Sequence, residues 1–180
     1  MQALIPSIAG ALLLGAANTL GDFIWASLDL RHRTAFGVAH GSLLLLCLGL
    51  FLGVLVGRPL VGAIGGIVGG ILAAAAFYVL APLMGMAAMF AAWMALWILV
   101  ALLDGVILRR EPAGPALVRG VSAAVLSGVA FFAVSGIWLQ PPPDGPNYLT
   151  NFVSWTIAFF PGFLALLAGR GAKKGTVTFS

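Results

Sequence analysis

Long apolar stretches, separated by short polar ones, run along almost the whole of this chain. A helix needs about 20 residues to cross the roughly 30 Å hydrocarbon core of a bilayer. Six apolar stretches reach that length, at residues 3–28, 35–56, 60–81, 83–108, 116–139 and 149–168. Their apolar residues are continuous and do not alternate with polar ones, which indicates helices and not the strands of a barrel. The sequence therefore predicts an all-α polytopic membrane protein, a six-transmembrane helix bundle.

Residues that break helices stand between the predicted spans. The breaks fall at residues 57–59, 81–82, 109–115 and 139–151, all of which contain proline. These connections leave no room for a soluble domain, so we expect a single transmembrane domain over residues 1–180 with a polar cytoplasmic tail at 169–180. No basic segment precedes the first span, and we expect it to be a retained helix and not a signal peptide.

Composition supports a location inside lipid. Hydrophobic residues make up 62% of the chain and charged residues 8%, and the mean hydropathy is +1.12. A soluble domain carries about a quarter charged residues. If both termini are cytoplasmic, seven of the nine Lys and Arg residues lie on the inner side and two, Arg31 and Arg33, on the outer side. This bias predicts a multi-pass protein of the cell (inner or plasma) membrane with both termini inside, and it explains the net charge of +4 without nucleic-acid binding.

The third span is rich in glycine. Gly62, Gly66 and Gly70 repeat every four residues, and Gly65 and Gly69 run beside them. Small residues at this spacing let two helix backbones approach closely. Three interpretations stay open: packing of this helix within one protomer, a homo-oligomer interface through the third span, or a glycine-lined pathway.

A weak internal similarity relates the two halves of the chain. The first span ends with Asp29 followed by Arg31 and Arg33, and the fourth ends with Asp104 followed by Arg109-Arg110. Three spans in each half would make the halves inverted across the membrane, an arrangement that builds many transporters. We therefore consider a 3+3 inverted repeat.

Polar residues line one face of the first span. Asn18, Asp22, Trp25 and Asp29 fall at positions i, i+4, i+7 and i+11, which share a helix face. Ionisable side chains at bilayer depth are rare and mark pathways or sites. The face either lines a wet vestibule, or Asp22 already lies near the outer interface and Asp29 pairs with Arg33 at the surface.

Histidine 40 stands in the second span. A histidine there can titrate near neutral pH and relay protons, or stay neutral and bond to a neighbouring helix. Metal binding is disfavoured, because His32, Cys47 and the aspartates have no recognisable ligand spacing relative to His40. No metal site is predicted.

Asp104 ends the fourth span, shortly before Arg109-Arg110. We expect it either to reach the cytoplasmic interface or pair with Arg119, or to act as a gate or coupling carboxylate.

Three functions follow from these residues. The first is a transporter or permeation protein for a small solute or ion, with Asn18, Asp22, Asp29, His40, Asp104 and Arg119 as candidates for its polar pathway. The second is a non-enzymatic accessory or lipid-binding subunit of a membrane complex. The third, an intramembrane lipid-acting enzyme, ranks last because no catalytic or cofactor motif rises above background. The expected partners are membrane lipids, a second copy of the chain or other membrane proteins, and no cofactor and no nucleic acid is expected.

Overall fold

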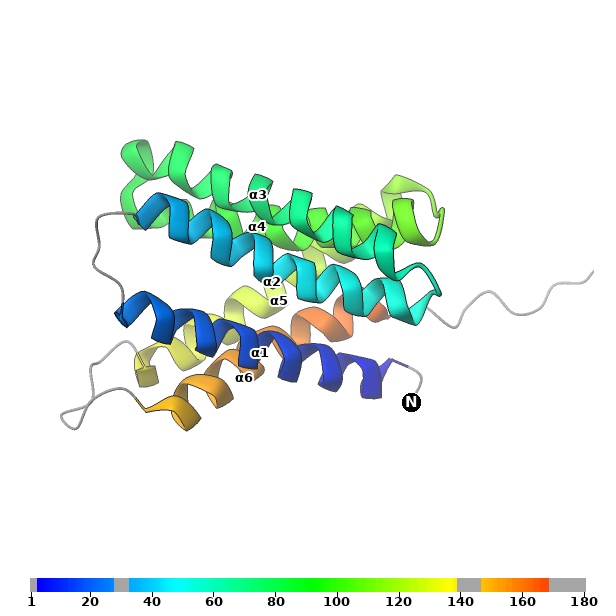
Figure 1. Ribbon diagram of the computed structural model, residues 1–180. Helices are drawn as coiled ribbons and strands as arrows, with labels where there is room; N and C mark the ends of the chain where they lie inside the picture. Colours follow the sequence, from blue (N-terminus) through cyan, green and yellow to red (C-terminus); the bar gives the residue numbers. More distant parts are fainter. Residues whose placement is uncertain (1–2, 28–32, 139–146, 169–180) are drawn as a thin grey trace, which may run out of the picture.

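The computed structural model describes residues 3–27, 33–138 and 147–168, and it places all their side chains except those of residues 25–27, 33, 86 and 135–138. The described residues form helices and turns without a strand. The elements are α1 (Leu4–Ser27), α2 (Arg33–Leu55), α3 (Pro59–Met84), the short 3₁₀ turn η2 (Gly85–Ala87), α4 (Ala88–Leu102), the π-helix η3 (Leu103–Leu108), α5 (Ala113–Trp138) and α6 (Tyr148–Leu167) (Figure 1). The predicted all-α six-helix bundle is confirmed.

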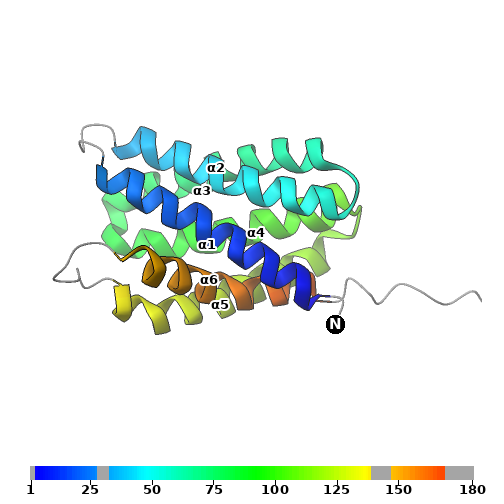
Figure 2. The same cartoon turned by 60° about the horizontal axis from the view of Figure 1, so that its bottom comes forward.

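The long helices lie side by side, so that the chain turns only at the two ends of the bundle (Figures 1 and 2). Helix α1 packs mainly on α6, α2 on α3, and α4 on both α3 and α5, while α5 packs on α6. The contact between α1 and α2 is much thinner than that between α2 and α3. We call the end where α1, α3 and α5 finish the Asp22 end, and the opposite end, which holds the α2–α3 turn, the Arg58 end.

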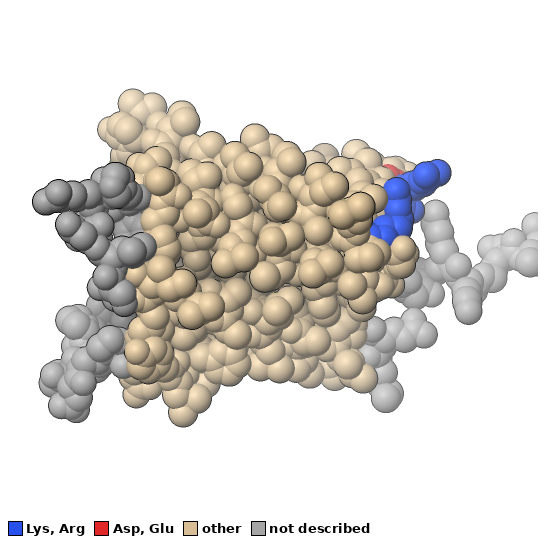
Figure 3. All heavy atoms as spheres, viewed as in Figure 1, with Lys and Arg blue, Asp and Glu red and all other residues tan. Residues whose placement is uncertain are grey.

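The surface of the bundle is apolar along its sides. Among the described residues, six helices have the length and composition to span a membrane, with mean hydropathy between 1.5 and 2.3. Exposed side chains on these helices include Ile5, Leu60, Leu83, Val118 and Leu149. In the face shown in Figure 3, the coloured Lys and Arg side chains gather at the Arg58 end. Such an apolar surface suits hydrocarbon and not water, so the chain is a multi-pass integral membrane protein.

Glycines bring α2 and α3 into backbone contact. A Cβ added to Gly49 of α2 would lie 2.9 Å from Gly66 Cα, and one added to Gly62 would lie 2.9 Å from Gly53 Cα. Carbon atoms normally approach to about 3.5–4.0 Å. Gly70 lies against the backbone of Gly41 in the same way. The α2–α3 pair is therefore held at a distance that only glycine permits.

The other two glycines of α3 face side chains of the same protomer. Gly65 lies against Leu103, and Gly69 against Leu45 and Leu99. All five glycines of the third span thus contact the protomer's own helices. A homo-oligomer through α3 stays a prediction, and it would use the opposite, lipid-facing side of this helix.

The turn between α3 and α4 lies beyond the break expected at residues 81–82. Helix α3 continues through Pro82, since a proline near the end of a helix removes only one backbone bond. The chain turns at Gly85, whose φ of 57° lies in the left-handed region that glycine adopts without steric cost. The fourth span then begins at Ala88 and ends as the π-helix η3, which contains Asp104.

Candidate functional site

A polar cluster lies inside the Asp22 end, where α1 meets α6. We call it the Asp22 cluster; it comprises Asn18, Thr19, Asp22, His40, Asn151 and Trp155. The carboxylate oxygen Oδ2 of Asp22 accepts one hydrogen bond from Trp155 Nε1 at 2.7 Å and another from Asn151 Nδ2 at 2.9 Å. Both donors come from one face of α6, because they are four residues apart. The side chain of Asn147 accepts from Thr150 N at 3.0 Å and thereby caps α6. The cap fixes where the helix begins and so positions both donors beside Asp22.

One turn further into the bundle, α1 is joined to α2. The ring nitrogen Nε2 of His40 lies 3.0 Å from Asn18 Oδ1, within hydrogen-bonding distance. The ring packs directly on Gly21, where any side chain would overlap it, and it stacks on Phe36 with 5.8 Å between ring centroids. This pair is a polar link in the otherwise thin α1–α2 contact.

The hydroxyl of Thr19 completes the cluster. Thr19 is only 9% exposed, and within the described part of the chain its Oγ1 has no hydrogen-bond partner. It precedes Asp22 by three residues, so the two are neighbours on the surface of α1. Buried hydroxyls are normally bonded, and this one lies about one helical turn before Asp22 on the same helix.

A second group of charges lies at the Arg58 end. Asp104 is fully buried and lies 3.9 Å from Arg109 Nη1. Glu111 bonds both Arg109, at 2.8 Å, and Arg119, at 2.6 Å. Glu111 therefore ties η3 to α5. The pairing of Asp104 with Arg119 stays a prediction.

Arg58, which lies in the α2–α3 turn, caps the C-terminal end of the π-helix η3. Its Nη1 donates to the carbonyl oxygens of Ile107 at 2.7 Å and Leu108 at 3.1 Å. Carbonyls at the end of a helix lack partners within the helix and attract cations. Arg58 thus connects the two turns at this end.

Aromatic side chains fill the bundle between the two polar groups. Trp97 is fully buried, with its ring 5.6 Å from that of Phe163 and 6.4 Å from that of Phe159. Phe51 of α2 meets Phe163 edge-on at 6.4 Å. Trp97 lies against Gly162, where a side chain would overlap its ring. These rings separate the cluster at the Asp22 end from the charges at the Arg58 end.

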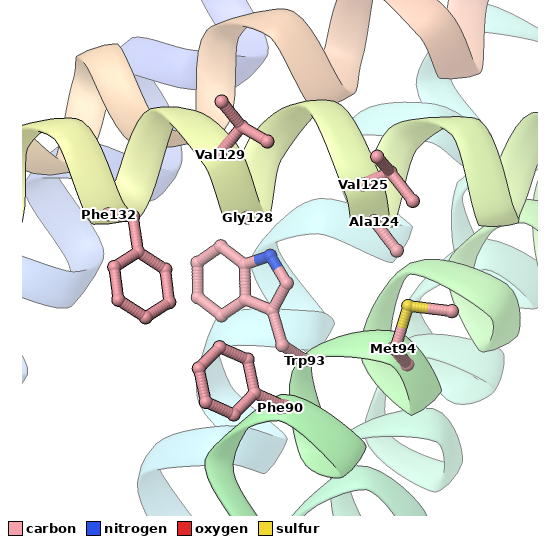
Figure 4. A pocket seen from close by; sticks show the side chains of 8 residues that line it. All are labelled: Phe90, Trp93, Met94, Ala124, Val125, Gly128, Val129 and Phe132. Atoms are coloured by element: carbon pink, nitrogen blue, oxygen red, sulfur yellow. The ribbon is translucent and has the colours of Figure 1, made fainter. Parts of the chain in front are cut away.

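An apolar groove of about 370 Å³ lies between α4 and α5 (Figure 4). It is lined by Phe90, Trp93, Met94, Ala124, Val125, Gly128, Val129 and Phe132. The rings of Phe90 and Phe132 stack at 5.4 Å, and Trp93 lies 6.3 Å from Trp155, the donor to Asp22. The stacked rings of Trp93 and Trp155 therefore lie between the groove and Asp22.

The structure brings together three of the residues that the sequence singles out, Asn18, Asp22 and His40, at one end of the bundle. It places Asp104 and Arg119 near Glu111 at the other end. Asp29 lies outside the described residues, as do the tail at 169–180 and most of the 139–151 loop.

Comparison with protein-family models, with curated proteins and with solved structures gave no match. Among the described residues, no group of three or more His, Cys, Asp or Glu side chains could hold a metal ion. The fold and the two polar groups define the class of the protein, a six-helix integral membrane protein. A more specific function has to be argued from the chemistry of the Asp22 cluster.

The double role of Glu111 gives a first prediction. In the Glu111→Gln variant, Arg119 loses its ion-pair partner and Arg109 keeps only Asp104 at 3.9 Å, and we expect the free energy of unfolding to fall by about 1–3 kcal/mol, since charged hydrogen bonds are worth about that much. Unfolding of the purified protein in mixed micelles, followed by circular dichroism, measures the change. Arg110→Gln is the matched control, because Arg110 is exposed. Equal stability of the two variants would show that the bridges contribute nothing.

Proposed function

We infer that this protein is a small transporter or permeation protein, and that the Asp22 cluster is the site where its small solute or ion enters. The observation that carries the inference is the carboxylate of Asp22. It is half-buried within the candidate membrane span Leu4–Ile24, and among the described residues only neutral groups bond to it. Ionisable residues within membrane spans are rare and usually have a functional role.

The carboxylates at the two ends of the molecule have different partners. At the Arg58 end, Asp104 and Glu111 each have an arginine within 4.0 Å. At the Asp22 end, no Lys or Arg among the described residues lies within 4.0 Å of Asp22. A buried carboxylate without a cationic partner keeps a desolvation cost that no opposite charge offsets. The arrangement at the Asp22 end supports a role for its negative charge toward something that arrives from outside the protein.

The space between the two ends supports a gated path and not an open pore. Trp97 and Phe163 fill the centre, so a solute passes only if these rings or their helices move. Pro161 interrupts the backbone bonding of α6 beside Gly162, which contacts Trp97. The thin α1–α2 contact offers a second place where helices can separate. Alternating access of this kind is usual for sites between two parts of a helix bundle.

The positions of the arginines predict how the protein is oriented in the membrane. Arg58, Arg109, Arg110 and Arg119 all belong to the Arg58 end, which we assign to the cytoplasm together with both termini. The Asp22 cluster then opens toward the outer side of the cell membrane.

The proposal is tested by permeation into proteoliposomes. Stopped-flow light scattering reports the volume change of vesicles exposed to glycerol, potassium thiocyanate or tetramethylammonium thiocyanate, whose lipid-permeant anion balances the charge of an entering cation. We expect the wild-type protein to accelerate at least one of these probes, and Asp22→Asn to lower that rate roughly tenfold or more, because the intramembrane charge is lost. Ser7→Ala is the matched control on α1, since among the described residues the Ser7 hydroxyl bonds only the carbonyl oxygen of Ala3, four residues earlier. Rates equal to those of empty vesicles for every probe, or an unaffected Asp22→Asn variant, would contradict the proposal.

The groove between α4 and α5 favours a second candidate, a lipid-binding subunit of a membrane complex. Its lining is apolar and faces the region of the lipid tails. Native mass spectrometry after gentle extraction decides between the two. A stoichiometric complex with other proteins would favour the subunit, and a protein that binds lipid without accelerating any probe would also support it.

A further inference from the structure

We propose that the Asp22 cluster binds a small organic cation, a compound with an ammonium group of methylamine or tetramethylammonium type. This inference rests on the proposed function and names the class of its substrate. It goes further than that function, because it concerns binding at equilibrium and can be tested without transport.

Charge complementarity is the first argument. Oδ2 of Asp22 already accepts two hydrogen bonds, whereas no described residue donates to Oδ1. His40, a titratable side chain on the neighbouring helix α2, is bonded to Asn18 and lies outside ion-pair distance of Asp22. One oxygen of an intramembrane carboxylate is thus left for a positive charge, and an anionic ligand would be repelled.

The set of oxygen atoms argues against a metal ion. Ca²⁺ needs six to eight oxygen ligands and Mg²⁺ an octahedral shell, usually with more than one carboxylate. The cluster offers one carboxylate, and the amide oxygen of Asn18 already faces His40. An ammonium group needs fewer partners. One carboxylate oxygen and the hydroxyl of Thr19, which lacks a partner among the described residues, can accept from it.

Aromatic rings lie next to two residues of the cluster. Phe23 follows Asp22 directly and stacks on Tyr148 with 3.4 Å between ring centroids. Phe36 stacks on His40. Organic cations are attracted to aromatic rings, whereas strongly hydrated inorganic ions lose more of their hydration there. Carboxylate and rings together match an alkylammonium ion.

The test is thermal unfolding of the purified protein in detergent. The probe is tetramethylammonium chloride, with sodium chloride at equal concentration as the control. A ligand that binds only the folded state raises the unfolding temperature by an amount that grows with the logarithm of its free concentration relative to its Kd. We expect tetramethylammonium to stabilise the wild type and Ser7→Ala alike, and its affinity to fall roughly tenfold or more in Asp22→Asn. With methylammonium chloride as the probe, whose N–H groups can donate to the Thr19 hydroxyl, Thr19→Val should show a loss of a few fold, and this variant serves if Asp22→Asn does not fold.

Each other outcome is decisive. Equal stabilisation by sodium and tetramethylammonium would overturn the choice of an organic cation. Affinity unchanged by both Asp22→Asn and Thr19→Val would overturn the site. If tetramethylammonium binds as expected but no probe enters proteoliposomes, the binding site stands and the proposed transport fails. If another probe shows flux that depends on Asp22 while tetramethylammonium does not bind, the transport proposal stands and this inference is wrong.

Discussion

Gly66→Ala is expected to separate α2 from α3 and to lower the free energy of unfolding by about 3 kcal/mol. A Cβ at this position would lie 2.7 Å from the carbonyl carbon of Leu45 and 3.2 Å from Leu46 Cα. Those atoms belong to the backbone of α2, so no rotation of a side chain can relieve the overlap. The measurement is unfolding in mixed micelles, followed by circular dichroism.

Gly128→Ala is the matched control for this prediction. Gly128 is also a glycine within a helix, but a Cβ there would have its nearest neighbour, Trp93 Cδ1, at an ordinary 4.0 Å. Alanine favours a helix over glycine by about 1 kcal/mol, so the control should be neutral or slightly stabilised. If both variants unfold alike, the close approach of α2 and α3 is not what holds this part of the bundle.

Trp97→Ala is expected to have the second large effect. Trp97 is fully buried and contacts Phe159, Phe163 and Gly162 at the centre of the molecule. Truncation of a buried tryptophan leaves a cavity and usually costs about 3–5 kcal/mol. The same unfolding experiment applies.

Phe132→Ala controls for the loss of an aromatic ring as such. Phe132 is 60% exposed on the lipid side of α5, so its removal should cost about 1 kcal/mol or less, because lipid replaces the ring. A Trp97→Ala variant as stable as Phe132→Ala would contradict a packed aromatic barrier between the two polar groups.

The number of helices and most of their limits were predictable because hydrocarbon imposes a length on each span. The break at residues 57–59 coincides with the α2–α3 turn for this reason. The α3–α4 turn was not predictable to the residue, since Pro82 is tolerated in the last turn of α3 and the turn depends on the positive φ of Gly85. The π-helix that holds Asp104 has no counterpart in the pattern of apolar residues.

The candidate site was predictable only in part. Asn18, Asp22 and His40 stand out because polar residues are rare in these spans. The hydrogen-bond partners of these residues do not stand out in the sequence. Helices that are apolar on all sides do not reveal which face packs on which neighbour. Asn147, which caps α6, and Asn151 and Trp155 within it recur at intervals of four residues, and that spacing is the one signal that points to the donors of Asp22. Nothing in the sequence singles out the bridging role of Glu111, which follows from the way η3 meets α5.

The most direct test of the account is whether water-soluble molecules reach the Asp22 cluster from one side of the membrane. Cys47, the single native cysteine, is replaced by alanine, and Thr19→Cys places a thiol beside Asp22. We expect a small, membrane-impermeant methanethiosulfonate reagent to label this thiol from the outer side only, and tetramethylammonium to slow the labelling. A thiol that reacts from neither side would contradict a solute site at the Asp22 end.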